Sequence, residues 1–197
     1  MDLNYKTVNI FPSIIHQFDV NGFEEIQDDL INYVYQYRNT FPKSESISNR
    51  GGWQSPSFIV ANENDKLENF LINCLSEFPP IKKSVQMKID CWININSPSS
   101  FNVKHNHPNC DLSGVLWIKC PNNSGNINFS NPSDFQSYNQ VESYTNEFKN
   151  LYNFYHSCSF KPKTGRFIVF PSHLEHDVDV NNSNEDRISI SFNIQLQ

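Results

Sequence analysis

The chain has 197 residues, 38% of them hydrophobic and 14% aromatic, and a formal net charge of −6 at pH 7. This length supports one hydrophobic core, so we predict a single domain over residues 1–197. The mild negative charge without a Lys/Arg cluster argues against a nucleic-acid partner. No apolar run has membrane-spanning length, and the first residues do not have the pattern of a signal peptide. We therefore predict a cytosolic protein.

Two helices are predicted in the first part of the chain. Apolar residues recur at helical spacing over residues 21–38, with Asn21 as the expected N-cap. The same spacing recurs over residues 63–78, where Pro79 and the proline after it end the helix. We therefore expect residues 1–80, approximately, to form a helical support for the rest of the chain.

From about residue 81 the pattern changes to short segments that alternate between apolar and polar residues, separated by Gly, Pro and Asn turns. The predicted strands cover residues 84–96, 112–120, 125–131, 154–162, 165–172, 176–180 and 186–197. Helices followed by a series of strands favour a mainly β protein, a sandwich or barrel with flanking helices packed on one sheet. Its core would span residues 81–197.

Two histidines with one residue between them suggest a metal site. On a strand, His105 and His107 would point to the same face, and imidazole is a common ligand of iron, copper, zinc and nickel. Such a pair also occurs by chance on protein surfaces. A third ligand must come from elsewhere in the chain, and the candidates are His156, His173, His176 and Asp111. The five cysteines form no CxxC pair and are interpreted as packing thiols.

The last predicted strand has one polar and one apolar face. The polar face carries Arg187, Ser189, Ser191 and Asn193, and the apolar face carries Ile188, Ile190, Phe192 and Ile194. If the polar face is buried, it needs a ligand, because burying unpaired polar groups is costly. An arginine there would favour a carboxylate or phosphate. The alternative is that this face lies in solvent.

These segments together resemble the Fe(II)- and 2-oxoglutarate-dependent dioxygenases. The matching motifs are HxH, LSGVxW, GxxxxFPSxxxHxV and RxSxSFN, which span about half of the chain, residues 92–195. They are most similar to a small prolyl-hydroxylase-like group with an LSG motif, found in bacteria and phages. The resemblance implies a double-stranded β-helix, which is a jelly-roll, cupin-like fold, and it implies Fe(II), 2-oxoglutarate and O2 as cofactor and co-substrates.

The resemblance also implies a set of metal ligands. The family's triad is His-x-Asp/Glu followed by a distal histidine. The first histidine of the triad carries over to His105, and the distal histidine carries over to His176. His107 stands where the family has the carboxylate, so the chain departs from the pattern there. The third ligand is either His107 or Asp111, and we favour His107 because its spacing from His105 suits a strand without any refolding of the loop.

Further residues are implied as the binding site for 2-oxoglutarate. Arg187 matches the family's anchor for the C5 carboxylate, and Ser189 would add a hydroxyl to it. Trp117 stands where related hydroxylases often have a tyrosine that touches 2-oxoglutarate; alternatively, it is a core aromatic. Asn94 is a candidate contact to the C1 carboxylate.

The implied activity is hydroxylation of a peptidyl or small-molecule substrate, coupled to decarboxylation of 2-oxoglutarate to succinate. The alternative is a non-catalytic, cupin-like protein that binds metal or ligand and has lost oxygenase activity. A third candidate, a cupin-type hydrolase or isomerase, would not need Arg187. Substrate specificity is expected in the loops at 44–58 and 133–152, the second with a lid role. The sequence predicts neither the substrate nor the oligomeric state, and a phage-encoded chain would act in the host cytoplasm.

Overall fold

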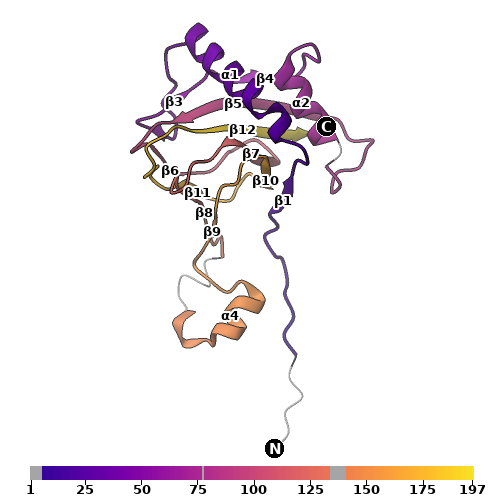
Figure 1. Cartoon of the computed structure of the whole chain (residues 1–197). Helices are drawn as coiled ribbons and strands as arrows, with labels where there is room; N and C mark the ends of the chain where they lie inside the picture. The colour runs from indigo at the N-terminus through magenta and orange to yellow at the C-terminus, as the bar shows by residue number, and fades with distance from the viewer. Residues whose placement is uncertain (1–5, 77, 134–140) are drawn as a thin grey trace, which may run out of the picture.

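The computed structural model describes residues 6–76, 78–133 and 141–197, and it consists of two facing antiparallel sheets with helices on the outer side of the larger one (Figure 1). The larger sheet has the order β1-β10-β7-β12-β5-β3, with β4 also beside β5. Its strands are β1 (His16–Asp19), β3 (Trp53–Gln54), β4 (Phe58–Ile59), β5 (Met87–Asn96), β7 (Leu112–Lys119), β10 (Arg166–Pro171) and β12 (Arg187–Leu196).

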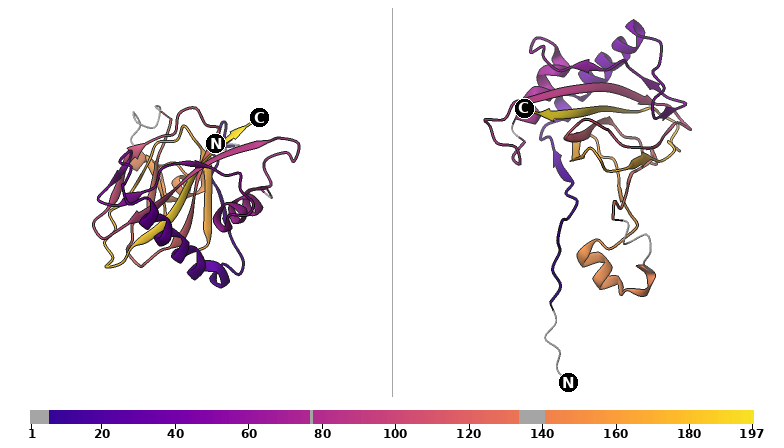
Figure 2. Two further views of the ribbon diagram at one scale, coloured as in Figure 1. Left: turned by 90° about the horizontal axis from the view of Figure 1, so that it is seen from above. Right: turned by 180° about the vertical axis from the view of Figure 1, so that it is seen from behind.

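The smaller sheet has the order β2-β6-β11-β8-β9. Its strands are β2 (Asn49–Arg50), β6 (Phe101–His105), β8 (Ile127–Ser130), β9 (Ser157–Phe160) and β11 (His176–Val178). The two sheets lie face to face beneath the helices (Figure 2). The mainly β, jelly-roll architecture predicted from the sequence is confirmed.

The apolar face of β12 lies at the centre of the main core, as its alternation predicts. Its four apolar side chains are fully buried, and β12 pairs along its length with β5 on one side and β7 on the other. The helices α1 (Glu24–Thr40) and α2 (Lys66–Ser76) cover this side of the sheet. Their buried residues in this core are Leu30, Val34, Leu67, Leu71 and Leu75.

The two predicted helices are present, with different starting points. Asn21 does not cap α1: Phe23 precedes that helix in helical conformation and makes no side-chain capping bond. Before α2, the carboxylate of Asp65 accepts bonds from the backbone N–H groups of Leu67 and Glu68 at 2.9 and 3.0 Å. This cap explains why α2 begins later than the predicted residue 63. No helix in the described parts of the chain is both long and apolar enough to cross a bilayer.

The region before residue 80 is more than a helical support, because β1, β2, β3 and β4 also lie in it. The strand β1 extends the larger sheet beside β10, and β2 pairs with β6 in the smaller sheet. The expected loop at 44–58 therefore contains short strands, which lie at one edge of each sheet. These strands have two to four residues, which is too short for alternation to be recognised in the sequence.

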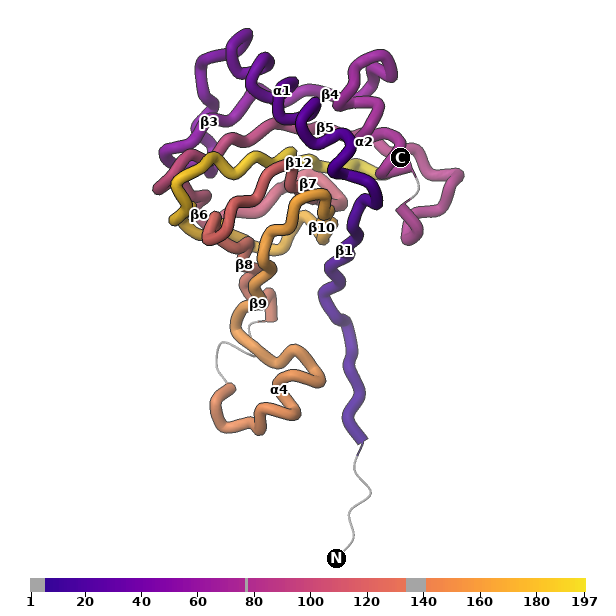
Figure 3. Tube along the Cα trace, viewed as in Figure 1, coloured from indigo at the N-terminus to yellow at the C-terminus, as the bar shows by residue number. Residues whose placement is uncertain are grey.

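A second predicted loop also contains helices. The 3₁₀ helix Val141–Ser143 and the helix α4 (Asn146–Tyr152) lie in an extension between β8 and β9. The Oγ1 atom of Thr145 caps α4 by accepting the backbone N–H of Phe148 at 3.2 Å. The extension leaves the sheets on the same side as the chain before β1 (Figure 3). Residues 134–140 of the expected loop lie outside the described residues, and its lid role stays a prediction.

Gly114, in the LSG motif, allows β7 to approach the main core closely. A Cβ atom at this position would lie 2.4 Å from Cζ of Phe192 and 2.7 Å from the carbonyl oxygen of Ile168. We expect Gly114→Ala to lower the free energy of unfolding by about 1–3 kcal/mol, measured by urea denaturation, because a packed core tolerates added volume poorly. Combining it with Phe192→Leu should cost less than the sum of the two single changes. Strict additivity would show that the clash with Phe192 is not the cause.

Candidate functional site

Three of the candidate histidines meet between the two sheets. His105 ends β6 and His176 begins β11, and the two residues are directly paired in the antiparallel ladder. His107 follows β6 by two residues and turns the same way, so that its Nε2 atom lies 3.4 Å from Nε2 of His176. One nitrogen from each of the three rings lies within 4.8 Å of the others. This spacing allows all three to bind a single metal ion.

Backbone carbonyl groups fix the tautomers of two of these histidines. Nδ1 of His105 lies 2.7 Å from the carbonyl oxygen of Val103, and Nδ1 of His176 lies 2.9 Å from that of Leu174. A carbonyl oxygen only accepts, so each Nδ1 carries the proton and donates it. The lone pair is then on Nε2, the form in which imidazole binds a metal, and the second bond orients each ring.

Burial keeps the three rings neutral. It lowers the pKa of His107 to about 3, with a further contribution from the nearby His176 and His105. Burial likewise lowers the pKa of His176 to about 4 and shifts that of His105 downward. Protons therefore do not compete with a metal ion for these nitrogens at neutral pH.

The other ligand candidates lie elsewhere. The Oδ2 atom of the exposed Asp111 accepts the backbone N–H of Leu196 at 2.8 Å, and Asp111 is not part of the histidine group. His156 and His173 are exposed and also stand outside that group. The structure thus brings together His105, His107 and His176. Asp111, the alternative third ligand, lies instead beside the end of β12.

The predicted cofactor-binding residues lie side by side on the larger sheet, facing the histidines. Ser189 on β12 is paired with Asn94 on β5 and with Trp117 on β7, so these three form one row across the sheet. Arg187 lies one row further along, opposite Asn96. All of these residues line the same cavity as the three histidines. The polar face of β12 is therefore buried at Arg187 and Ser189, which are 2% and 6% exposed, and half-buried at Ser191 and Asn193, so the solvent alternative is excluded for Arg187 and Ser189.

Arg187 is a buried cation without a carboxylate partner. Its Nη1 atom donates to the carbonyl oxygens of Ser124 and Gly125. Among the described residues no acidic group lies within ion-pair distance of it. Burial lowers its pKa to about 10, which leaves the guanidinium charged at neutral pH. A buried, charged and incompletely bonded arginine fits a site for an anionic ligand.

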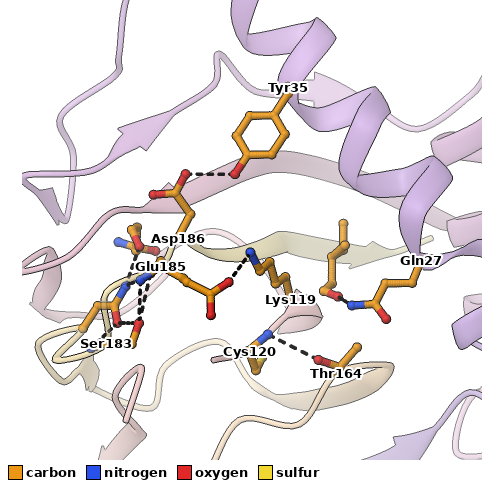
Figure 4. Close-up of polar contacts among 11 residues, drawn as sticks. Gln27, Tyr35, Lys119, Cys120, Thr164, Ser183, Glu185 and Asp186 are labelled. Atoms are coloured by element: carbon orange, nitrogen blue, oxygen red, sulfur yellow. Dashed lines mark hydrogen bonds and ion pairs between the residues drawn. The ribbon is translucent and has the colours of Figure 1, made fainter. Parts of the chain in front are cut away.

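Polar contacts hold the loop before β12 against α1 and β7 (Figure 4). Asp186 accepts a hydrogen bond of 2.9 Å from the hydroxyl of Tyr35 on α1, and Glu185 forms a 2.8 Å ion pair with Lys119 at the end of β7. The buried Asn181 donates from Nδ2 to the carbonyl oxygens of Asn96 and Glu185, each at 2.8 Å. These contacts hold the first residue of β12 against both neighbouring strands.

Asn94 has a buried polar atom without a partner. Its Nδ2 atom donates to Oγ of Ser191 at 3.0 Å, while Oδ1 makes no hydrogen bond. Because a serine hydroxyl both donates and accepts, the amide group can turn over and keep a bond to Ser191. In that orientation the free Nδ2 hydrogen is available to a carboxylate in the cavity, as expected for a contact to 2-oxoglutarate.

The cavity also contains residues that were not predicted to bind a ligand. The ring of Trp92 lies 5.6 Å from that of His107, centroid to centroid. Beyond Arg187, the Nδ2 atom of Asn96 donates to Oδ1 of Asn49 at 3.3 Å, and Nδ2 of Asn102 donates to Oγ of Ser48 at 3.1 Å. Alternation along β5 already puts Trp92 and Asn96 on the face of Asn94. Ser48 belongs to the 44–58 region, which was expected to lie beside the substrate, but no motif singled out this residue.

Solved structures similar to this chain share its fold. A prolyl-4-hydroxylase of Pseudomonas putida is 11% identical, with 93% of this chain and 92% of that chain covered and a TM-score of 0.61. A prolyl hydroxylase of Trichoplax adhaerens, solved with a hypoxia-inducible-factor peptide fragment, is 13% identical. The match covers 92% of this chain and 83% of that chain, with a TM-score of 0.62. The α-ketoglutarate-dependent carbocyclase SnoK from nogalamycin biosynthesis is 8% identical. The match covers 92% of this chain and 79% of that chain, with a TM-score of 0.64.

No curated protein matches the sequence. Residues 90–193, just over half of the chain, match the family described as "Putative 2OG-Fe(II) oxygenase". This range runs from β5 to β12 and includes the three histidines and the row of polar residues opposite them. Neutral imidazoles at metal-binding distance and an unpaired buried arginine fit the iron and 2-oxoglutarate that the family requires. The chain belongs to the 2OG-Fe(II) oxygenase family.

Proposed function

We propose that the cavity between the two sheets is the active site of a 2-oxoglutarate-dependent hydroxylase in which His105, His107 and His176 hold Fe(II). In the same proposal Arg187 and Ser189 bind the C5 carboxylate of 2-oxoglutarate, and Asn94 and Trp117 bind along its length. The observation that carries the proposal is a buried arginine without a counter-charge in the same cavity as three converging neutral imidazoles.

When bound, Fe(II) and 2-oxoglutarate supply the oxidation, using O2 and releasing succinate and CO2. The chain orients and protects the reacting groups. The imidazoles of His105, His107 and His176 would hold the ion, which would supply the redox chemistry next to the bound co-substrate. Apolar side chains of the cavity wall, among them Ile127, Phe170 and Val178, exclude water from this space.

The substrate in this proposal is a peptidyl or small-molecule compound that approaches the histidine end of the cavity. Two of the similar structures are prolyl hydroxylases, which supports a peptidyl residue as the group that is hydroxylated. A cytosolic location and the absence of nucleic-acid and membrane partners stay predictions from the sequence.

We expect the protein, supplied with Fe(II), O2 and ascorbate, to convert 2-oxoglutarate into succinate, detected by mass spectrometry, and candidate proline-containing peptides to increase the rate. His156→Ala, at an exposed histidine outside the cavity, should behave like the parent. The second candidate function, a non-catalytic binding protein, is favoured by the absence of a carboxylate from the histidine group. Binding of both Fe(II) and 2-oxoglutarate without any succinate would establish that alternative.

A further inference from the structure

Two segments carry exposed apolar side chains that belong to neither hydrophobic core. The first is the arm, residues 6–15, which precedes β1 and forms no helix or strand. Its side chains of Val8, Ile10, Phe11 and Ile14 are between 54% and 95% exposed, and after its first residue the arm has no charged side chain. Single exposed apolar residues are common, but four so close together indicate a surface that contacts another molecule.

The second segment is the extension between β8 and β9. The aromatic rings of Tyr144, Phe148, Tyr152 and Phe154 contact one another there, with centroid distances of 4.7 to 5.6 Å. None of these four residues is part of either core of the sandwich. Tyr144 is exposed, and Leu151 is 67% exposed. The extension therefore packs on itself and leaves apolar surface accessible.

The extension begins at the histidine end of the cavity. Phe129, near the end of β8, is paired with His176, the first residue of β11. The backbone N–H of the next residue, Ser130, donates to the carbonyl oxygen of Glu175 at 2.9 Å. The chain thus enters the extension directly beside one of the proposed metal ligands.

The arm leaves the sandwich at the same end. The strand β1 is antiparallel to β10, with His16 paired to Val169, so the residues before His16 continue past Pro171, the last residue of β10. The carbonyl oxygen of Ser172 accepts the backbone N–H of His107 at 3.0 Å. Figures 1 and 2 show the arm and the extension projecting from the sheets on the same side. Both segments therefore lie where a substrate approaches the three histidines.

We propose that the arm and the extension are a docking surface for an extended, apolar segment of a polypeptide substrate, which they guide to the histidine end of the cavity. The inference rests on the proposed function and names its substrate class, a polypeptide and not a small molecule. When extended, the arm from Val8 to Ile15 spans up to about 26 Å, at about 3.3 Å per residue, which only a long ligand can follow. A second copy of this chain docked on both segments would block the approach to the cavity, which favours the substrate as the occupant.

A binding experiment with the full-length protein tests the substrate class. The immobilised protein is exposed to two libraries of peptides of about fifteen residues, long enough to reach from the cavity along the arm, each with a central proline. The other positions hold Leu, Phe, Tyr, Ser and Asn in the apolar library and Gly, Ser, Asn, Asp and Lys in the polar library. The parent should retain the apolar library at least roughly tenfold more strongly, as quantified by mass spectrometry. This measurement needs neither metal nor turnover, so it is independent of oxygenase activity.

Two variants remove apolar side chains outside the cavity. Ile10→Ser combined with Phe11→Ser changes the arm, and Leu151→Ser changes the extension. Each variant should retain the apolar library roughly five- to tenfold less than the parent, because truncating a central interface residue commonly weakens binding by that factor. Val180→Ser is the matched control, because Val180 is an exposed apolar residue beyond the end of β11 that is opposite to His176. It should bind like the parent, and circular dichroism checks that all variants are folded.

Kinetics distinguish docking from a change in the active site. With a long peptide selected from the apolar library, the arm and extension variants should raise KM by roughly five- to tenfold and leave kcat unchanged. A peptide of about five residues with the same central proline reaches only the cavity, and it should give the same rates in the parent and in every variant.

Equal retention of the two libraries by the parent would overturn the inference, and so would parent-like retention by both variants. If light scattering finds a dimeric parent and monomeric variants, the surface covers a second copy and the inference is wrong. Succinate formation without a preference for apolar peptides would contradict this inference alone. Retention of the apolar library without any succinate formation would support the docking surface and contradict only the proposed hydroxylase activity.

Discussion

Replacing His176 by alanine is expected to abolish stoichiometric binding of Fe(II), and His105→Ala should have the same effect. Each change removes one of the three proposed protein ligands, and we expect two imidazoles alone to hold a metal only weakly. Loss of a residue that merely orients a ligand typically lowers metal affinity by about 10–100-fold, so loss of a ligand should exceed that range. Anaerobic calorimetry and the metal content of the purified protein measure the effect.

Controls are needed because His176 is also part of the second core. It is 4% exposed, and its ring lies 4.9 Å from that of Phe170 and 5.7 Å from that of Phe129. His176→Gln keeps most of the side-chain volume and should lose the metal with less effect on stability. His173→Ala, at an exposed histidine three residues earlier, should bind metal like the parent. Tight stoichiometric binding by either His176 variant would contradict the ligand assignment.

The second large effect concerns Arg187, and here 2-oxoglutarate should be lost while the metal site remains. Removing one partner of a buried charge pair costs about 3–5 kcal/mol. At about 1.4 kcal/mol per tenfold change, Arg187→Ala should weaken 2-oxoglutarate binding by roughly two to three orders of magnitude. Arg187→Lys should recover part of this loss, because an ammonium group keeps the charge but not the planar pair of donors.

Titration of 2-oxoglutarate into the Mn(II)-loaded variants measures this loss. Because Arg187 is not one of the three clustered histidines, Mn(II) binding in the absence of 2-oxoglutarate should not weaken. Lys88→Ala removes an exposed cation of the same sheet that does not line the cavity, and it should leave 2-oxoglutarate affinity close to that of the parent. If Arg187→Ala binds 2-oxoglutarate as tightly as the parent, the anchor lies elsewhere.

The parts of the fold that could be predicted are those in which one short pattern decides the structure. Alternation over ten residues of β12 assigned Ile190 and Phe192 to the core and Ser189 to the opposite face. The spacing of His105 and His107 likewise indicated a shared direction, although His107 lies two residues beyond the end of β6 and keeps that direction only through the following turn. The inference for β12 needs only the geometry of a single strand.

Other parts depend on contacts between distant segments and could not be predicted. The strand β2 has two residues, and its pairing with β6 brings Ser48 to the cavity wall. Whether Asp111 or His107 reaches the other histidines depends on the turn after β6, in which Asp111 is held by the backbone of Leu196. The unpaired Oδ1 of Asn94 appears only when the neighbours of its strand are known.

The two faces of β12 give this strand a low tolerance for changes in chain length. Inserting or deleting one residue near its middle would turn every following side chain to the opposite face. Side chains between Arg187 and that point would keep their faces. Beyond it, Phe192 and Ile194 would turn from the core to the cavity side of the sheet, and Asn193 would turn into the core. Core and cavity would be damaged by the same event. Length variation among relatives should therefore be excluded from β12 and collect in segments such as the extension that carries α4.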